Sequence, residues 1–162
     1  MKRAAILVAI LPLLAGCGFR PLYGDPGLEP QLSAIYVEPV PDNEGYALRN
    51  TLIDLLGSDG REAGKRYHLR LLLKSTNQGV ALQNDATITR YNDTLDVTWV
   101  LTGGDGKAIA SGTQSSLSSY NVADSPYATQ AAREDSDRRA AQDIAERIRI
   151  DLAAWFHRRD RR

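Results

Sequence analysis

Apolar and polar residues alternate in the middle of this chain with the two-residue period of half-buried strands. In residues 67–74 the alternation is broken once, by Leu72. The clearest case covers residues 94–101, whose apolar face consists of Leu95, Val97, Trp99 and Leu101. Alternation of this kind predicts a strand over each of the two ranges.

Two further strands are predicted on either side of these. Residues 34–38 form a short β-rich run that Pro39 and Pro41 end, which is typical of a first strand. Residues 108–120 follow a glycine-rich turn and are rich in Ser and Thr, with Ile109 and Leu117 as the large aliphatic residues. We expect this last strand to have one solvated face and to suit the edge of a sheet. Residues 75–85 are consistent with either a continuation of the preceding strand or a hairpin region.

Two other stretches follow the helical period. Asp42 or Asn43 can cap a helix from about residue 44, which Gly57 ends; its apolar stripe is Leu48, Leu52, Ile53, Leu55 and Leu56. Ser125 and Pro126 open the last helix, since proline fits a first helical turn. Its first half is polar, and the apolar side of its second half is Ala141, Ile144, Ala145, Ile148, Leu152 and Trp155.

The order of elements is therefore a strand, a helix, three meandering strands and a long helix. Each element must bury its apolar side against another layer. We expect an α+β fold, a two-layer sandwich in which two helices pack on one face of a four-stranded, mostly antiparallel sheet.

The first seventeen residues are typical of a secretory signal. The basic start Met1-Lys2-Arg3 is followed by an apolar stretch over residues 4–15, with small residues before a cleavage position. A membrane-spanning helix needs roughly 20 apolar residues, and this stretch is shorter. The sequence Leu14-Ala15-Gly16-Cys17 resembles the lipobox of bacterial lipoproteins.

This resemblance implies that Cys17 becomes an N-terminal, S-diacylglyceryl and N-palmitoyl cysteine after cleavage. Gly18 rather than Asp follows it, which under the usual Gram-negative sorting rule favours the outer membrane, facing the periplasm. We expect a cleaved signal peptide over 1–16, an acylated leader over 17–33, one domain over 34–158 and a basic tail over 159–162. A plain signal peptide is the alternative, but Cys17 is the only cysteine and could form no internal disulfide.

Composition limits the partners that this domain could have. The chain of 162 residues carries 20 basic and 20 acidic side chains, and loss of Lys2 and Arg3 would leave a formal charge of −2. A nucleic-acid partner is not expected, because such proteins usually show a marked basic excess or face.

Catalysis has weak support in the sequence. The two histidines are His68, at a polar position of its strand, and His157, in an arginine-rich tail. No Gly-x-Ser-x-Gly elbow occurs, and no spacing of Cys, His and carboxylates resembles a metal site. We therefore expect no enzyme activity, no metal and no cofactor.

Several blocks of the chain, in order, resemble the α-proteobacterial LPS-assembly lipoproteins of the LptE family. The leader block is Cys17-Gly18-Phe19-Arg20-Pro21-Leu22-Tyr23-Gly24, and the second is Ala86-Thr87-Ile88-Thr89-Arg90-Tyr91. The others are Ser119-Tyr120-Asn121-Val122, Ser125-Pro126-Tyr127-Ala128, Arg139-Ala140-Ala141, and the segment from Ile148 to Phe156. The family's fold, two helices against a four-stranded sheet, is the one that the periodicity predicts.

The resemblance implies a lipoprotein that sits largely inside the outer-membrane β-barrel LptD, helps it fold and helps deliver lipopolysaccharide to the cell surface. Large barrels are commonly plugged, and the polar strand over 111–119 is the first candidate for barrel contact. An ordinary solvated strand face is an equally valid interpretation of that strand.

Lipopolysaccharide carries phosphates, which Arg binds with paired hydrogen bonds. Arg90, Arg133 and Lys74 are candidate contacts on that ground, although each could be an ordinary surface charge. The basic residues 158–162 could interact with the dipole of the helix end or with anionic lipid headgroups. Two other classes stay open: a lipid-anchored envelope hydrolase, which would need His68 or His157, and a generic periplasmic binding lipoprotein.

Overall fold

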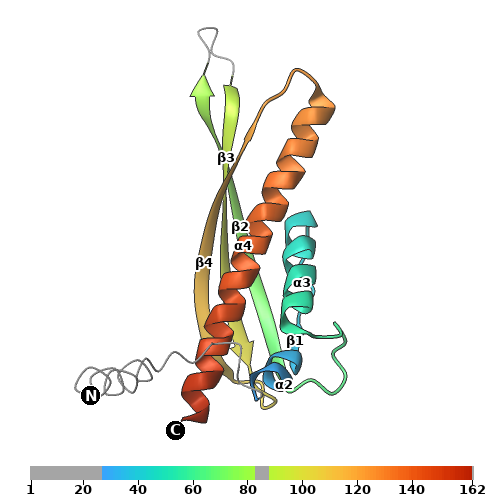
Figure 1. Ribbon diagram of the computed structural model, residues 1–162, viewed down its shortest axis with the longest axis vertical. Coiled ribbons are helices and arrows are strands. Elements are labelled where there is room, and N and C mark those ends of the chain that lie inside the picture. The colour runs from blue at the N-terminus through green and yellow to red at the C-terminus, as the bar shows by residue number, and fades with distance from the viewer. Residues whose placement is uncertain (1–26, 83–87, 162) are drawn as a thin grey trace, which may run out of the picture.

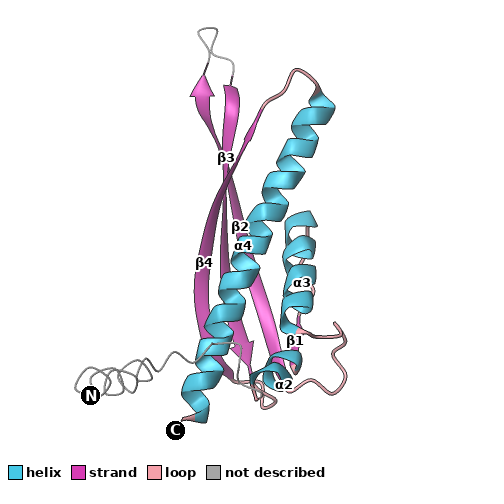
Figure 2. Ribbon diagram, viewed as in Figure 1, coloured by secondary structure: helices cyan, strands magenta, loops and turns pink. Residues whose placement is uncertain are grey.

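The computed structural model of this protein describes residues 27–82 and 88–161. In chain order the elements are α2 (Leu28–Ser33), β1 (Ile35–Val37), α3 (Asn43–Leu56), β2 (Tyr67–Leu82), β3 (Ile88–Thr102), β4 (Ala108–Asn121) and α4 (Pro126–Asp160). The strands form one four-stranded sheet in the order β1-β2-β3-β4, with helices against it (Figure 2). This confirms the predicted α+β class.

The sheet is antiparallel except at its first pair. β1 runs parallel to β2 with Ile35 beside Tyr67, whereas β2–β3 and β3–β4 are antiparallel. β2 extends to Leu82, so residues 75–82 continue the strand rather than start a hairpin. β4 is an edge strand, as its polar sequence suggested.

Both long helices lie on the same face of the sheet, as predicted. α4 packs mainly against β4 and α3, and α3 also contacts β1 (Figure 1). α3 ends at Gly57, which adopts the left-handed conformation (φ 62°) that favours glycine at helix ends. α4 begins at Pro126 after Ser125, in agreement with the sequence.

The core lies between the helices and the inner face of the sheet. Leu95, Val97, Trp99 and Leu101 are all buried, as are Ala141, Ile144, Ala145, Ile148 and Leu152 of α4. At the end of the α4 stripe the prediction is only approximate: Trp155 is partly exposed and Phe156 is fully buried. Phe156 lies four residues beyond Leu152, which keeps it on the buried face of a helix with 3.6 residues per turn.

A short helix that the sequence did not predict closes one end of the core. α2 falls within the range assigned to the leader, and its Leu28 and Leu32 are buried. The two leucines are four residues apart and therefore share one helix face. α2 also meets the last turn of α4, where Gln31 Nε2 donates to Asp160 Oδ2 at 2.8 Å.

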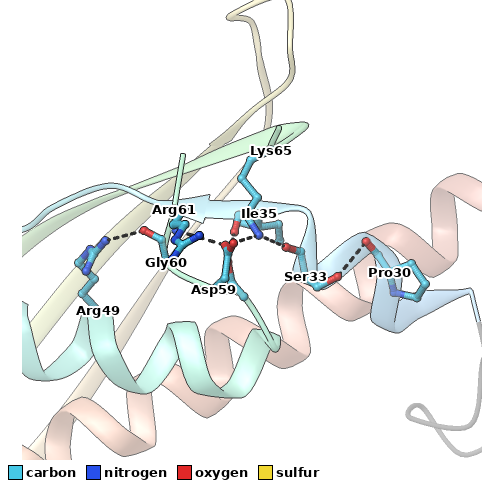
Figure 3. A network of polar contacts seen from close by, with 9 residues as sticks. Pro30, Ser33, Ile35, Arg49, Asp59, Gly60, Arg61 and Lys65 are labelled. Carbon is cyan, nitrogen blue, oxygen red and sulfur yellow. Dashed lines mark hydrogen bonds and ion pairs between the residues drawn. The ribbon is translucent and has the colours of Figure 1, made fainter. Parts of the chain in front are cut away.

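A network of polar contacts fixes the loop between α3 and β2 (Figure 3). Lys65 Nζ contacts Asp59 Oδ1 at 2.8 Å and donates to the Ser33 carbonyl at 2.8 Å. Arg49 donates to the carbonyls of Val37 and Gly60. The hydrogen bond from Lys65 is the main cause that lowers the pKa of Asp59 below its usual value. This loop leads into β2, which begins at the same end of the molecule as α2 (Figure 1).

Within the described ranges, no helix combines the length and the apolar composition needed to cross a bilayer.

Candidate functional site

None of the described elements covers the face of the sheet opposite the helices, and we call this face the open face (Figure 1). Cross-strand neighbours point to the same side of an antiparallel sheet, so the registers place three strands on this face. It comprises Arg70, Leu72 and Lys74 of β2, Thr94, Asp96, Thr98 and Val100 of β3, and Ser111, Thr113, Ser115 and Leu117 of β4. Most of these side chains are polar.

Two leucines interrupt the polar surface of the open face. Leu72 is 61% exposed and Leu117 is 65% exposed, although most large apolar side chains of the described chain are buried. Leu72 lies in a row with Thr98 and Thr113, whose hydroxyl oxygens are 3.4 Å apart. Leu117 lies in another row, beside Thr94, so the two leucines are single apolar positions on a polar surface rather than one contiguous patch. The sequence contained this signal, since Leu72 breaks the alternation and Leu117 stands in a polar strand.

The polar residues of β4 divide between two roles. Those on its inner face bond to α4: Gln114 Nε2 donates to Asp151 Oδ2 at 2.6 Å and Ser116 Oγ donates to Asp143 Oδ2 at 2.8 Å. Ser136 Oγ donates to Ser118 Oγ at 2.8 Å in the same seam. Only the alternate residues of the 111–119 candidate strand therefore face outward, and they belong to the open face.

The three cations predicted to contact lipopolysaccharide lie apart from one another. Lys74 is on the open face opposite Asp96. Arg90 is exposed near the hairpin end of β3, opposite Asn121, and lines a cavity of about 420 Å³ at the β4 edge. Arg133 projects from α4 into a different cavity, of about 620 Å³, between α3 and α4. The structure thus brings these residues into no shared site.

The cavity that Arg133 lines has more acidic than basic side chains, with four carboxylates against Arg133 and Arg138. Its lining includes Glu44 of α3 and Asp137 of α4. Burial, and then the charges of Glu44 and Asp93, raise the pKa of Asp137 to about 6. An anionic cavity of this kind opposes phosphate binding, so its electrostatics give no support to Arg133 as a phosphate ligand.

The other candidate residues are the lipid-attachment cysteine and the two histidines. Cys17 and the signal peptide lie outside the described residues, so the attachment of lipid remains a prediction. His68 packs edge-on against the ring of Tyr36, with centroids 5.6 Å apart, and its Nδ1 is 3.9 Å from Glu62 Oε1. His157 lies on α4, a different element. Among residues 27–82 and 88–161, no group of three or more His, Cys, Asp or Glu is placed to hold a metal ion.

Comparison with known proteins places this architecture in a family. The LptE model, described as lipopolysaccharide-assembly, matches residues 32–152. The uncharacterized protein RP188 of Rickettsia prowazekii (strain Madrid E) is 26% identical over 155 residues, which are 94% of this chain and 97% of RP188.

Solved structures of lipoproteins share the fold. A candidate lipoprotein from Caulobacter crescentus CB15 superposes with a TM-score of 0.70 at 31% identity, covering 82% of this chain and 97% of that one. Rare lipoprotein B from Shewanella oneidensis has a TM-score of 0.57 at 13% identity, covering 78% and 96% respectively. Because the family match spans well over half of the sequence, and because the fold agrees with these structures, this protein belongs to the LptE lipopolysaccharide-assembly family.

Proposed function

We propose that this protein is an outer-membrane lipoprotein, anchored through acylated Cys17, that serves lipopolysaccharide assembly as a non-catalytic partner of an LptD-like β-barrel. Membership of the LptE family supports the role in assembly. The lipobox ending in Cys17 supports the anchor. The partnership with the barrel is supported by the shape and chemistry of the open face.

The open face is the observation that carries the proposal. All the described helices lie on the other side of the sheet, so three long strands present side chains that nothing in the described chain covers (Figure 1). The interior of an outer-membrane barrel is polar and lined by alternating strand residues. Ser, Thr and Asp on the open face can exchange hydrogen bonds with such a lining, while Leu72 and Leu117 provide apolar contacts where the polar groups leave gaps.

The proposal can be tested by placing charge at the two exposed leucines. A Leu72→Asp, Leu117→Asp variant should keep its fold, because both side chains are exposed, but should lose most of the β-barrel that co-purifies with wild-type protein from detergent extracts. Tyr46→Asp is a matched control, since Tyr46 is 66% exposed on α3. Equal recovery of the barrel with all three proteins would refute docking through the open face.

The hydrolase alternative predicts a different result. It requires an essential histidine, whereas His68 and His157 lie on β2 and α4. We expect a His68→Gln, His157→Gln variant to support lipopolysaccharide assembly at the wild-type level in cells depleted of the native protein. Loss of assembly by a folded, correctly located double variant would favour the hydrolase.

A further inference from the structure

A cluster of arginines and aromatic rings lies at the end of the molecule where α4 finishes. It surrounds an open cavity of about 1000 Å³. The cations are Lys65, Arg66, Arg158 and Arg159, and the rings are Tyr67 and Trp155; we call these six residues the basal cluster. They come from the loop that precedes β2, from the first residue of β2 and from the last turns of α4, which are far apart in sequence.

The aromatic rings hold two of the arginines in place. The guanidinium carbon of Arg159 lies 5.5 Å from the centre of the Trp155 ring and 5.9 Å from that of Tyr67. Arg159 Nη1 also donates to the Tyr67 hydroxyl at 3.1 Å. Arg66 lies 5.9 Å from the same Tyr67 ring. Stacking on a ring leaves much of the in-plane N–H edge of a guanidinium available, and that edge fits phosphate oxygens.

The positive charge of the basal cluster is only partly neutralised. Lys65 is bound to Asp59 and to the Ser33 carbonyl. Among the residues that the structure describes, Arg66, Arg158 and Arg159 form no ion pair with a carboxylate. Asp105, the one acidic residue among the described residues that line the cavity, is 3.8 Å from Lys107. The cavity is therefore suited to an anion.

The described part of the chain begins at the end of the molecule that carries the basal cluster. α2 contacts the last turn of α4 through Gln31 and Asp160, and the β3–β4 turn lies beside them (Figure 1). Cys17 precedes Gly27 by ten residues, a span of at most about 35 Å. A lipid on Cys17 would hold this end, rather than the β2–β3 hairpin end, near the membrane surface.

We infer that the basal cluster binds the anionic phospholipid headgroups of the membrane that holds the lipid anchor. This inference rests on the lipid attachment proposed above for the placement of the cluster. Phosphate groups would meet Arg66, Arg158 and Arg159, while the partly exposed Trp155 would lie at headgroup depth, where Trp is enriched in membrane proteins. Contact of this kind would orient the domain as well as tether it.

Vesicle binding tests the inference without the anchor or the barrel. The protein would be produced from Gly18 onward, which keeps the whole described core, since that core begins at Leu28. Co-sedimentation would compare vesicles of phosphatidylethanolamine with phosphatidylglycerol against vesicles of phosphatidylcholine alone. We expect salt-sensitive binding to the anionic vesicles, and about fivefold weaker binding for each cation removed by Arg66→Gln, Arg158→Gln or Arg159→Gln.

Two variants separate headgroup binding at the basal cluster from a general effect of charge or packing. Arg138→Gln, in the polar half of α4, should bind as wild type does. Arg158→Gln removes an exposed side chain that stacks on no ring of the described chain, so its effect does not depend on the packing of Tyr67. Equal binding to phosphatidylcholine, wild-type binding by the Arg158→Gln variant, or displacement by soluble glycerol phosphate would each overturn the inference. None of these outcomes bears on docking to the barrel, because the test uses neither Cys17 nor the open face.

Discussion

At residue 112 the sheet carries no side chain, and the indole ring of Trp99 occupies the space above it. The register pairs Trp99 with Gly112, and a Cβ at Gly112 would lie 2.8 Å from Trp99 Cε2. A contact that short forces the ring or the strand to move. The sequence predicts that Trp99 is buried, but the role of Gly112 depends on strand register and could not be predicted.

We expect Gly112→Ala to destabilise the protein by about 1–3 kcal/mol, the usual cost of overpacking a core. Urea denaturation monitored by circular dichroism would measure the loss. Gly104→Ala is the control, because its Cβ would meet only the Arg66 carbonyl at 3.8 Å. Equal stability of wild type and Gly112→Ala would mean that the ring is not confined as described.

Two isoleucines of α4 provide a direct test of which helix face is buried. Ile148 is fully buried and Ile150 is 44% exposed. Ile148→Ala should reduce the free energy of unfolding by about 2–5 kcal/mol, whereas Ile150→Ala should change it by less than about 1 kcal/mol. The same denaturation measurement applies, and a larger loss for Ile150 would show that the helix faces are reversed.

Asp137 should make stability depend on pH. Its pKa is raised to about 6 in the fold, from an ordinary value of 3.8. The folded state therefore holds this proton more tightly, and the stabilisation is present below pH 3.8 and is lost as pH rises through about 6. Asp137→Asn should then be more stable than wild type at pH 7.5, by about 1 kcal/mol because solvent screens a partly exposed carboxyl.

That advantage should vanish near pH 3.5, where both side chains are neutral. Denaturation at the two pH values measures it, with Glu146→Gln as an exposed control on the same helix. An advantage of the same size at both pH values would contradict a raised pKa for Asp137.

At the scale of elements, periodicity was sufficient to predict the strands and the two long helices. The alternation in 94–101 and the helical spacing from Ala141 to Leu152 correspond directly to the buried residues. Pairing was not predictable in the same way, because the parallel contact of β1 with β2 joins Val37 to Leu69 across an intervening helix. α2 was missed because it has only six residues, too few for a period to be recognised.

The candidate surfaces were harder to predict than the fold. The Ser- and Thr-rich composition of β4 was consistent with either barrel contact or a solvated face. In the structure, Gln114, Ser116 and Ser118 instead form hydrogen bonds with α4. The basal cluster combines Arg66 and Tyr67, at the junction of a loop with β2, with Trp155 and Arg159 of α4. No sequence spacing connects positions that lie about ninety residues apart, so only the fold brings them together.

The two halves of α4 should differ in their stability against local opening. Within α4, no residue from Pro126 to Asp135 is buried, and Ser136 is the first that is. Backbone amide hydrogens of the first half should exchange with solvent at least about tenfold faster than those near Ile148, because few buried contacts stabilise that half of the helix. Hydrogen exchange followed by mass spectrometry would measure this, and uniform protection along α4 would contradict it.

Over the whole molecule, the two sides of the sheet differ in what they carry. One side carries the described helices and the hydrophobic core. The other side is open, polar and interrupted by Leu72 and Leu117. The C-terminal end of α4 lies at one end of the long axis, and the end of β2 and the start of β3 lie at the other (Figure 1). A domain of this shape can be oriented at its base while its sheet meets a partner.

Photocrosslinking from the open face in intact cells would test the central proposal most directly. A crosslinking residue would be placed at Thr98 or Thr113, at the middle of the open face, and at Glu146 on the exposed side of α4. We predict that Thr98 and Thr113 form an adduct with a large outer-membrane β-barrel and that Glu146 yields much less of it. Adducts from Glu146 alone, or none from Thr98 and Thr113 in cells that assemble lipopolysaccharide normally, would contradict docking through the open face.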